Sequence, residues 1–265
     1  MVSASVSNPG VNSSFSSPPP VIYSTTKIRI ALTLILIPAI DLSQGRVVHA
    51  RRGRRDDYQP VRSKLCRSCE PTDVISGLLR LHTFSTLYIA DLDAIRGLGN
   101  QRDVLEKLRD QFPDLDIWID PGINTRARYR QWQQLALGST VLGSETLSNP
   151  GLLLNTLATD TDTVLSLDFK CDKLLGPADL LEQPEHWPTR VIVMCLDRVG
   201  SDEGPDTDRM QQLRRKSPRS DLFAAGGIRD LDDLLHLRQL GVAGALLASA
   251  LHDGRIGPAQ IAALA

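Results

Sequence analysis

A chain of 265 residues suffices for one large domain or two small ones, and its 42% of apolar residues supply a sizeable core. The net charge of −1 lacks the basic excess typical of nucleic-acid binding, so we expect no nucleic-acid partner. Four cysteines are too few for a disulfide framework and favour a cytoplasmic location. Because no apolar run reaches about 18 residues, we expect no membrane span.

The first 27 residues differ in composition from the rest of the chain. Serine is frequent, three consecutive prolines occupy positions 18–20, and the first acidic residue is Asp41. Such a segment buries too little apolar surface to offset the entropy of ordering it. Residues 1–27 are therefore predicted to be a disordered Ser/Pro-rich tail, and residues 28–265 a single domain. An organelle transit peptide is the alternative, but Lys27 is the only cation of this segment.

From residue 28 onward, short β-rich runs alternate with amphipathic segments of helical period. The clearest predicted helices cover 73–81, 102–112, 126–137 and 230–240. The predicted strands cover 32–40, 86–90, 116–119, 139–142, 163–167, 190–196, 222–225 and 244–248. Eight strands that alternate with helices favour a closed (β/α)₈ TIM barrel of the α/β class, with an open doubly wound sheet as the alternative.

An internal repeat favours the closed barrel. Short strings around Asp93, Gly122 and Gly143 recur in the same order, and at nearly constant spacing, in the second half of the chain. The string around Asp41 also resembles the one around Asp168. Duplication of a four-strand unit leaves this pattern, so we predict a half-barrel internal repeat.

Two carboxylates mark the place where chemistry is expected. In a TIM barrel, ligands meet the loops that follow the strands. Asp41 and Asp168 follow the apolar runs of the first and fifth predicted strands, where period-2 alternation points both side chains inward. Two carboxylates that face each other across the mouth suit general acid–base catalysis. Capping of the next helix is the alternative role for each.

A phosphate site is predicted after the seventh and eighth strands. Gly226 and Gly227 allow backbone N–H groups to approach an anion, and Ser249 begins a short helix after strand eight. A plain tight turn is the alternative reading of the two glycines. A phosphorylated small molecule is thus the expected partner, and the oligomeric state stays open.

The repeat places a second candidate phosphate site in the first half, at Gly122, Gly143 and Ser144. Asp120 adds negative charge beside that site, and Pro121 removes an N–H donor. The sequence therefore favours phosphate binding in the second half over the first.

Several residues of the loops are further candidates for substrate binding. His49 and Arg51 follow the first strand, and Arg51 opens a stretch with four arginines that either clamps an anion or forms a solvated loop. Lys170, two residues past Asp168, is a candidate phosphate ligand or Schiff-base nucleophile. Cys66 and Cys69 have the spacing of metal ligands but lack a second close pair, so we assign no metal and no cofactor.

These motifs together resemble the HisA/HisF family of histidine-biosynthesis barrels, over about residues 34–256. The resemblance rests on the strings at 38–42, 87–93 and 226–228. It implies an Amadori rearrangement of an aminoaldose to an aminoketose, with Asp41 as the catalytic carboxylate of strand one and Asp168 as a supporting one. It also implies phosphate binding at both glycine sites.

Two departures from the family pattern concern the acid and the first phosphate. The family has a catalytic Asp where this chain has Val199, and Asp197, two residues earlier, is the candidate substitute. The family's Gly-Gly after strand three is replaced by Asp120 and Pro121. The leading hypothesis is a HisA-like isomerase of a phosphoribosyl-type metabolite.

Two alternatives to this hypothesis remain open. One is a divergent paralogue with another phosphorylated substrate, acting as a lyase or synthase through Lys170. Divergent relatives in genomes that make tetrahydromethanopterin-type one-carbon cofactors give that alternative a biosynthetic context. The other is a non-catalytic binding subunit that has lost the acid at Val199.

Overall fold

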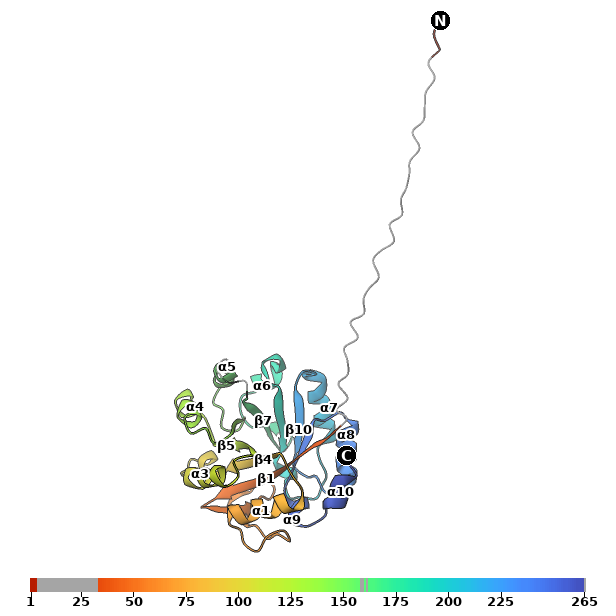
Figure 1. Cartoon of the computed structure of the whole chain (residues 1–265). Coiled ribbons are helices and arrows are strands. Elements are labelled where there is room, and N and C mark those ends of the chain that lie inside the picture. The colour runs from red at the N-terminus through yellow and green to blue at the C-terminus, as the bar shows by residue number, and fades with distance from the viewer. Residues whose placement is uncertain (4–32, 158–159, 161, 265) are drawn as a thin grey trace.

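The computed structural model describes residues 1–3, 33–157, 160 and 162–264. Most of the predicted tail and the start of the first predicted strand lie outside these residues. Eight parallel strands form a closed barrel surrounded by helices, as Figure 1 shows. The barrel strands are β1 (Ile35–Ser43), β4 (Thr86–Asp91), β5 (Asp116–Asp120), β6 (Ser139–Gly143), β7 (Val164–Lys170), β9 (Arg190–Cys195), β10 (Asp221–Ala225) and β11 (Gly244–Leu247).

The pairing of the first and last strands closes the barrel. β1 pairs in parallel with β4 on one side and with β11 on the other, where Ile35 lies opposite Gly244. The (β/α)₈ prediction is therefore confirmed, and the open doubly wound sheet is excluded. Each predicted strand coincides with an observed one to within a few residues.

Both half-barrels begin with a strand that continues into an antiparallel hairpin. β1 turns back through β2 (Arg46–His49), which pairs in turn with β3 (Gln59–Pro60), and β7 turns back through β8 (Lys173–Leu174). The first strand thus extends beyond its predicted end at Ile40. The matching hairpins on the first and fifth barrel strands agree with the predicted half-barrel repeat.

Helices cover the outside of the barrel. The four predicted helices correspond to α1 (Pro71–Leu81), α3 (Arg102–Gln111), α4 (Arg126–Gln133) and α8 (Leu231–Gln239). The shorter α4 ends where Ala136 takes a positive φ of 49°. The remaining helices are α2 (Leu92–Ile95), α5 (Gly151–Leu157), α6 (Asp179–Glu182), α7 (Thr207–Lys216), α9 (Ser249–His252) and α10 (Pro258–Ala262), with 3₁₀ turns η1 (Arg55–Asp57), η2 (Pro184–His186) and η3 (Leu196–Arg198). In the described part of the chain, no helix has the length and apolar character needed to cross a bilayer.

Strand alternation divides the apolar residues between two cores. On β4, Leu87 and Ile89 belong to the large core between strands and helices, whereas Tyr88 and Ala90 belong to the smaller core inside the barrel. Inside the barrel, the rings of Trp118 and Phe223 meet edge to face with centroids 5.0 Å apart. The barrel interior is therefore packed, and ligands are confined to its C-terminal mouth.

Candidate active site

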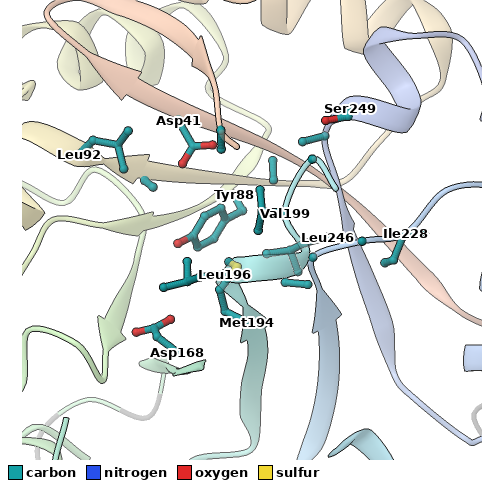
Figure 2. A pocket seen from close by; sticks show the side chains of 18 of the residues that line it. Asp41, Tyr88, Leu92, Asp168, Met194, Leu196, Val199, Ile228, Leu246 and Ser249 are labelled. Carbon is teal, nitrogen blue, oxygen red and sulfur yellow. The ribbon is translucent and has the colours of Figure 1, made fainter. Parts of the chain in front are cut away.

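A cavity opens at the C-terminal ends of the barrel strands. Its empty volume is about 910 Å³, including open solvent at the mouth. Residues from both half-barrels line it, and Figure 2 shows Asp41 and Asp168 toward one side of the pocket and Ser249 and Ile228 toward the other. This is where the sequence predicted the site.

Three of the aspartates that line the cavity lie on barrel strands, where alternation aims them inward. On β5, Asp120 lies two residues after Trp118, which belongs to the interior core. On β7, Asp168 lies four residues after Val164 of the interior core, and on β1, Asp41 lies four residues after Ile37 of the same core. An even number of residues along a strand keeps both side chains on the inward face. Three different strands thus place carboxyl groups in one cavity.

Asp168 is held by a dense set of hydrogen bonds. Its Oδ2 accepts from Ser144 Oγ at 3.3 Å and from the Glu145 amide at 3.2 Å. Its Oδ1 accepts from Ser166 Oγ at 2.7 Å. Burial and the nearby charge of Glu145 nevertheless raise the pKa of Asp168 to about 7. Asp168 is therefore rigidly positioned and titrates near neutrality.

Asp120 lies beside Asp168, across the backbone of Gly143. Its Oδ1 accepts from the Gly122 amide at 3.0 Å. A Cβ at Gly143 would lie 2.7 Å from Asp120 Oδ2 and 3.3 Å from Asp168 Oδ2, so both carboxyl groups fit only because residue 143 has no side chain. Burial and the charge of Asp168 raise the pKa of Asp120 well above its usual range.

Asp41 faces a half-buried cation from the loop after β2. Although Asp41 contacts the cavity, protein surrounds it on its other sides, and this burial raises its pKa to about 6, while Arg55 acts in the opposite direction. Arg55 itself is paired with Glu145: its Nη1 lies 3.0 Å from Oε2, and its Nη2 bonds to Oε1. Tyr58 completes this wall of the cavity, and burial and Asp41 raise its pKa to about 12.

The opposite end of the cavity has the predicted glycines. Gly226 and Gly227 adopt φ angles of 99° and 83° and both line the cavity. A Cβ at Gly226 would lie 2.4 Å from the Cys195 carbonyl oxygen, so close packing requires glycine there in any case. Ser249 and Arg255 also line this end, and Arg255 forms ion pairs with Asp202 at 2.7 Å and Asp253 at 3.2 Å.

The model of the histidine biosynthesis protein family matches residues 35–257, the whole barrel. The chain belongs to this family. It is 29% identical over 222 residues to an uncharacterised protein of Methanocaldococcus jannaschii. The matched residues make up 83% of this chain and 93% of that protein. This family membership agrees with the resemblance found in the sequence motifs.

Two further relatives are imidazole-4-carboxamide isomerases whose names specify two 5-phosphoribosyl groups. The enzyme of Thioalkalivibrio sulfidiphilus is 26% identical over 254 residues, covering 88% of this chain and 99% of its own. The enzyme of Leuconostoc mesenteroides is 24% identical over 241 residues, covering 86% and 98%.

The structure distinguishes the position of the missing acid after β9 from its candidate substitute. Val199, at the family's acid position, lines the cavity with its aliphatic side chain. Asp197 lies in the 3₁₀ turn η3 and is not among the residues that line the cavity. Asp197 thus follows the cavity-lining Leu196 directly in sequence but does not itself line the cavity.

The first-half phosphate residues lie behind the cavity wall. Gly122 packs against the backbone of Ala94 and Ile95, and it lines no part of the cavity. The hydroxyl of Ser144 is fully buried and bonded to Asp168. Gly143 contributes space for the carboxyl groups instead of a surface for an anion. Phosphate binding there remains a prediction that this geometry does not favour.

The candidate residues of the loops lie at the edge of the cavity or outside it. His49 is exposed and bonded to Ser249 Oγ at 3.0 Å. Arg51 is exposed, and only Arg55 of its arginine stretch lines the cavity. Lys170 Nζ lies 3.5 Å from the Gly53 carbonyl oxygen, away from the cavity lining. Its position gives no support to a Schiff base in the cavity.

Several features of the site could not be found from the sequence. Arg55 belongs to the predicted arginine stretch, but its pairing with Glu145 was missed because an ion pair between positions so distant in sequence leaves no local pattern. Tyr88 had a usable signal: it stands two residues before Ala90 on the inward face of a strand. The Cys66 and Cys69 side chains pack against the outer core, on the far side of the strands from the cavity.

Proposed function

We propose that this protein is an isomerase that converts a phosphorylated aminoaldose of phosphoribosyl type into the corresponding aminoketose. The observation that carries the proposal is the placement of Asp41 and Asp168, from strands β1 and β7, in one cavity. Their pKa values, raised to about 6 and about 7, lie where proton transfer to and from carbon and oxygen is efficient at neutral pH. Family membership supports the same reaction class.

The reaction needs a base for one carbon and an acid for one oxygen. Asp41 is suited to be the base, because the nearby Arg55 stabilises its ionised form. It removes the proton from C2 of the opened sugar and returns it to C1. The acid that protonates the ring oxygen and so opens the ring is expected in the part of the cavity that Asp168 lines. Enclosure in the barrel mouth limits water and strengthens these interactions.

The charges of the cavity favour a substrate with one phosphate. At one end, Gly226 and Gly227 offer backbone approach, Ser249 offers a hydroxyl, and the guanidinium of Arg255 is paired with Asp202 and Asp253. The other end presents the Asp120–Asp168 pair, whose negative charge would repel a second phosphate. This chain is therefore proposed to differ from its isomerase relatives, whose named substrate carries two phosphoribosyl groups.

The test compares two substrates with the purified protein. One is an N-aryl-5-phosphoribosylamine, which has a single phosphate, and the other is the bis-phosphorylated imidazole-carboxamide ribotide. We expect turnover of the first, with NMR showing the C1 aldose signal replaced by a C2 ketone and, in D₂O, deuterium at C1. Asp41→Asn should lower kcat by about 10²–10⁴-fold. Asp114→Asn, an exposed site before β5, is the matched control.

Three results would contradict the proposal. Turnover of neither substrate would refute the isomerase, and substrate binding without turnover would favour the non-catalytic alternative. Efficient turnover of the bis-phosphorylated ribotide alone would refute the single-phosphate cavity. Full activity of Asp41→Asn would refute the base.

A further inference from the structure

Asp120 differs from Asp168 in how its oxygens are satisfied. Asp168 accepts three hydrogen bonds, which favour its ionised form. Asp120 accepts one, at Oδ1, and among the described residues no donor bonds to its Oδ2. Asp120 is only 3% exposed, yet it belongs to the cavity lining. A nearly buried carboxyl group that lines the cavity thus has one oxygen without a hydrogen-bond donor among the described residues.

The two carboxyl groups are too close for both to be ionised at little cost. The Oδ2 atoms of Asp120 and Asp168 both lie near the position that a Cβ would take at Gly143, at 2.7 and 3.3 Å from it. Two carboxylates at such range retain one proton between them. The three donors on Asp168 stabilise the charge there, so the proton resides on Asp120.

The other charged and titratable groups around Asp120 do not reverse this order. Glu145, from the loop after β6, adds a second negative charge nearby. Arg55, from the loop after β2, acts in the opposite direction on Asp120, and Glu145 already pairs with it. Tyr88, on the adjacent strand β4, is neutral because burial and the surrounding aspartates raise its pKa well above its usual range.

We propose that Asp120, on strand β5, is the general acid of this active site. It takes over the role of the acid that relatives carry in the loop after β9, where this chain has Val199. This inference rests on the proposed isomerase function and adds to it the residue that protonates the substrate. Asp168 is then a positioning residue, which holds the proton on Asp120 by its own charge.

Asp120 and Asp41 together account for every proton transfer of the isomerisation. The Asp120 carboxyl donates its proton to the ring oxygen as the C1–O bond breaks, and the nitrogen lone pair forms C1=N. Asp41 removes the C2 proton, the C2–H electrons form C1=C2, and the C1=N pair returns to nitrogen. The C2 hydroxyl of the enaminol then gives its proton to the Asp120 carboxylate, while Asp41 protonates C1. Both residues end in their starting states.

The first experiment follows protonation without a substrate. The protein is labelled with ¹³C at the aspartate side-chain carboxyls, and NMR titrations of wild type, Asp120→Asn and Asp168→Asn assign the two signals. We expect the Asp120 signal to remain in its protonated position at pH 7. In Asp168→Asn its midpoint should move to lower pH, because the neighbouring charge is gone. A signal for Asp120 that ionises before Asp168 would overturn the proposal.

The second experiment measures the catalytic consequence with the N-aryl-5-phosphoribosylamine. Asp120→Asn preserves shape and hydrogen bonding but holds no transferable proton, so kcat should fall by about 10²–10⁴-fold with KM nearly unchanged. The fall of kcat at high pH, which reports the acid, should disappear, and Asp114→Asn should behave as wild type. Unchanged kcat in Asp120→Asn would overturn the acid. Wild type inactive on both sugars would refute the isomerase and, with it, this role.

Discussion

The space left by Gly143 yields a quantitative prediction. Gly143→Ala adds one methyl group whose carbon would lie 2.7 Å from Asp120 Oδ2 and 3.3 Å from Asp168 Oδ2. Asp168 is fixed by its hydrogen bonds, and Asp120 is tied to the Gly122 amide at 3.0 Å, so neither can retreat freely. Overpacking of this kind costs about 1–3 kcal/mol. We expect the free energy of unfolding to fall by that amount and kcat to fall with it.

Urea unfolding of a double-mutant cycle checks the cause. In the Asp120→Ala background the main clash is removed, so the same Gly143→Ala change should cost little. The difference between the two costs is expected to be about 1 kcal/mol or more, as for residues in direct contact. Equal costs in both backgrounds would show that the alanine disturbs strand β6 itself and would refute the reasoning.

Three further predictions concern the charges of the site. Arg55→Met removes the cation that lowers the pKa of Asp41, so the acid limb of the pH–rate profile should move to higher pH; an unmoved limb would exclude Asp41 as the base. The folded pKa of Asp168 is raised to about 7, so between about pH 4 and 7 the folded protein binds more protons than the unfolded chain. The free energy of unfolding should therefore fall as the pH rises through this window, by up to ~1.4 kcal/mol per pH unit. Denaturation of Asp168→Asn at pH 5 and pH 7.5 should show a weaker dependence, and an unchanged one would contradict the shift. Ser249→Ala should weaken inhibition by inorganic phosphate by roughly 2–10-fold, the loss of one hydrogen bond, whereas unaltered inhibition would place the phosphate elsewhere.

Much of the barrel could be predicted because its strands carry their own signals. Buried parallel strands are short apolar runs, and each predicted run became a barrel strand. Alternation also gave the direction of Asp41 and Asp168 correctly. The β1–β2 hairpin was missed because the continuous apolar run ends at Ile40, while the strand continues through Asp41 and Leu42 to Ser43.

The chemistry of the site was less predictable because it depends on contacts across the mouth. From the sequence, Asp120 predicts only that phosphate binding nearby is disfavoured. Its relation to Asp168 arises from the register of three strands and from the missing side chain at Gly143. In the same way, the sequence offers Asp197 as a substitute for the acid missing at Val199, and only the 3₁₀ turn η3 shows that Val199, not Asp197, lines the cavity.

The matching hairpins on β1 and β7 show how closely the two half-barrels still correspond in backbone. A mouth with that pseudo-twofold symmetry, if its two ends were alike, would accept an elongated ligand in either direction. The acidic end at Asp120 and the glycine end at Gly226 remove this ambiguity. A ligand with one anionic terminus then has a single orientation, and each of its carbon atoms meets the same side chain in every binding event.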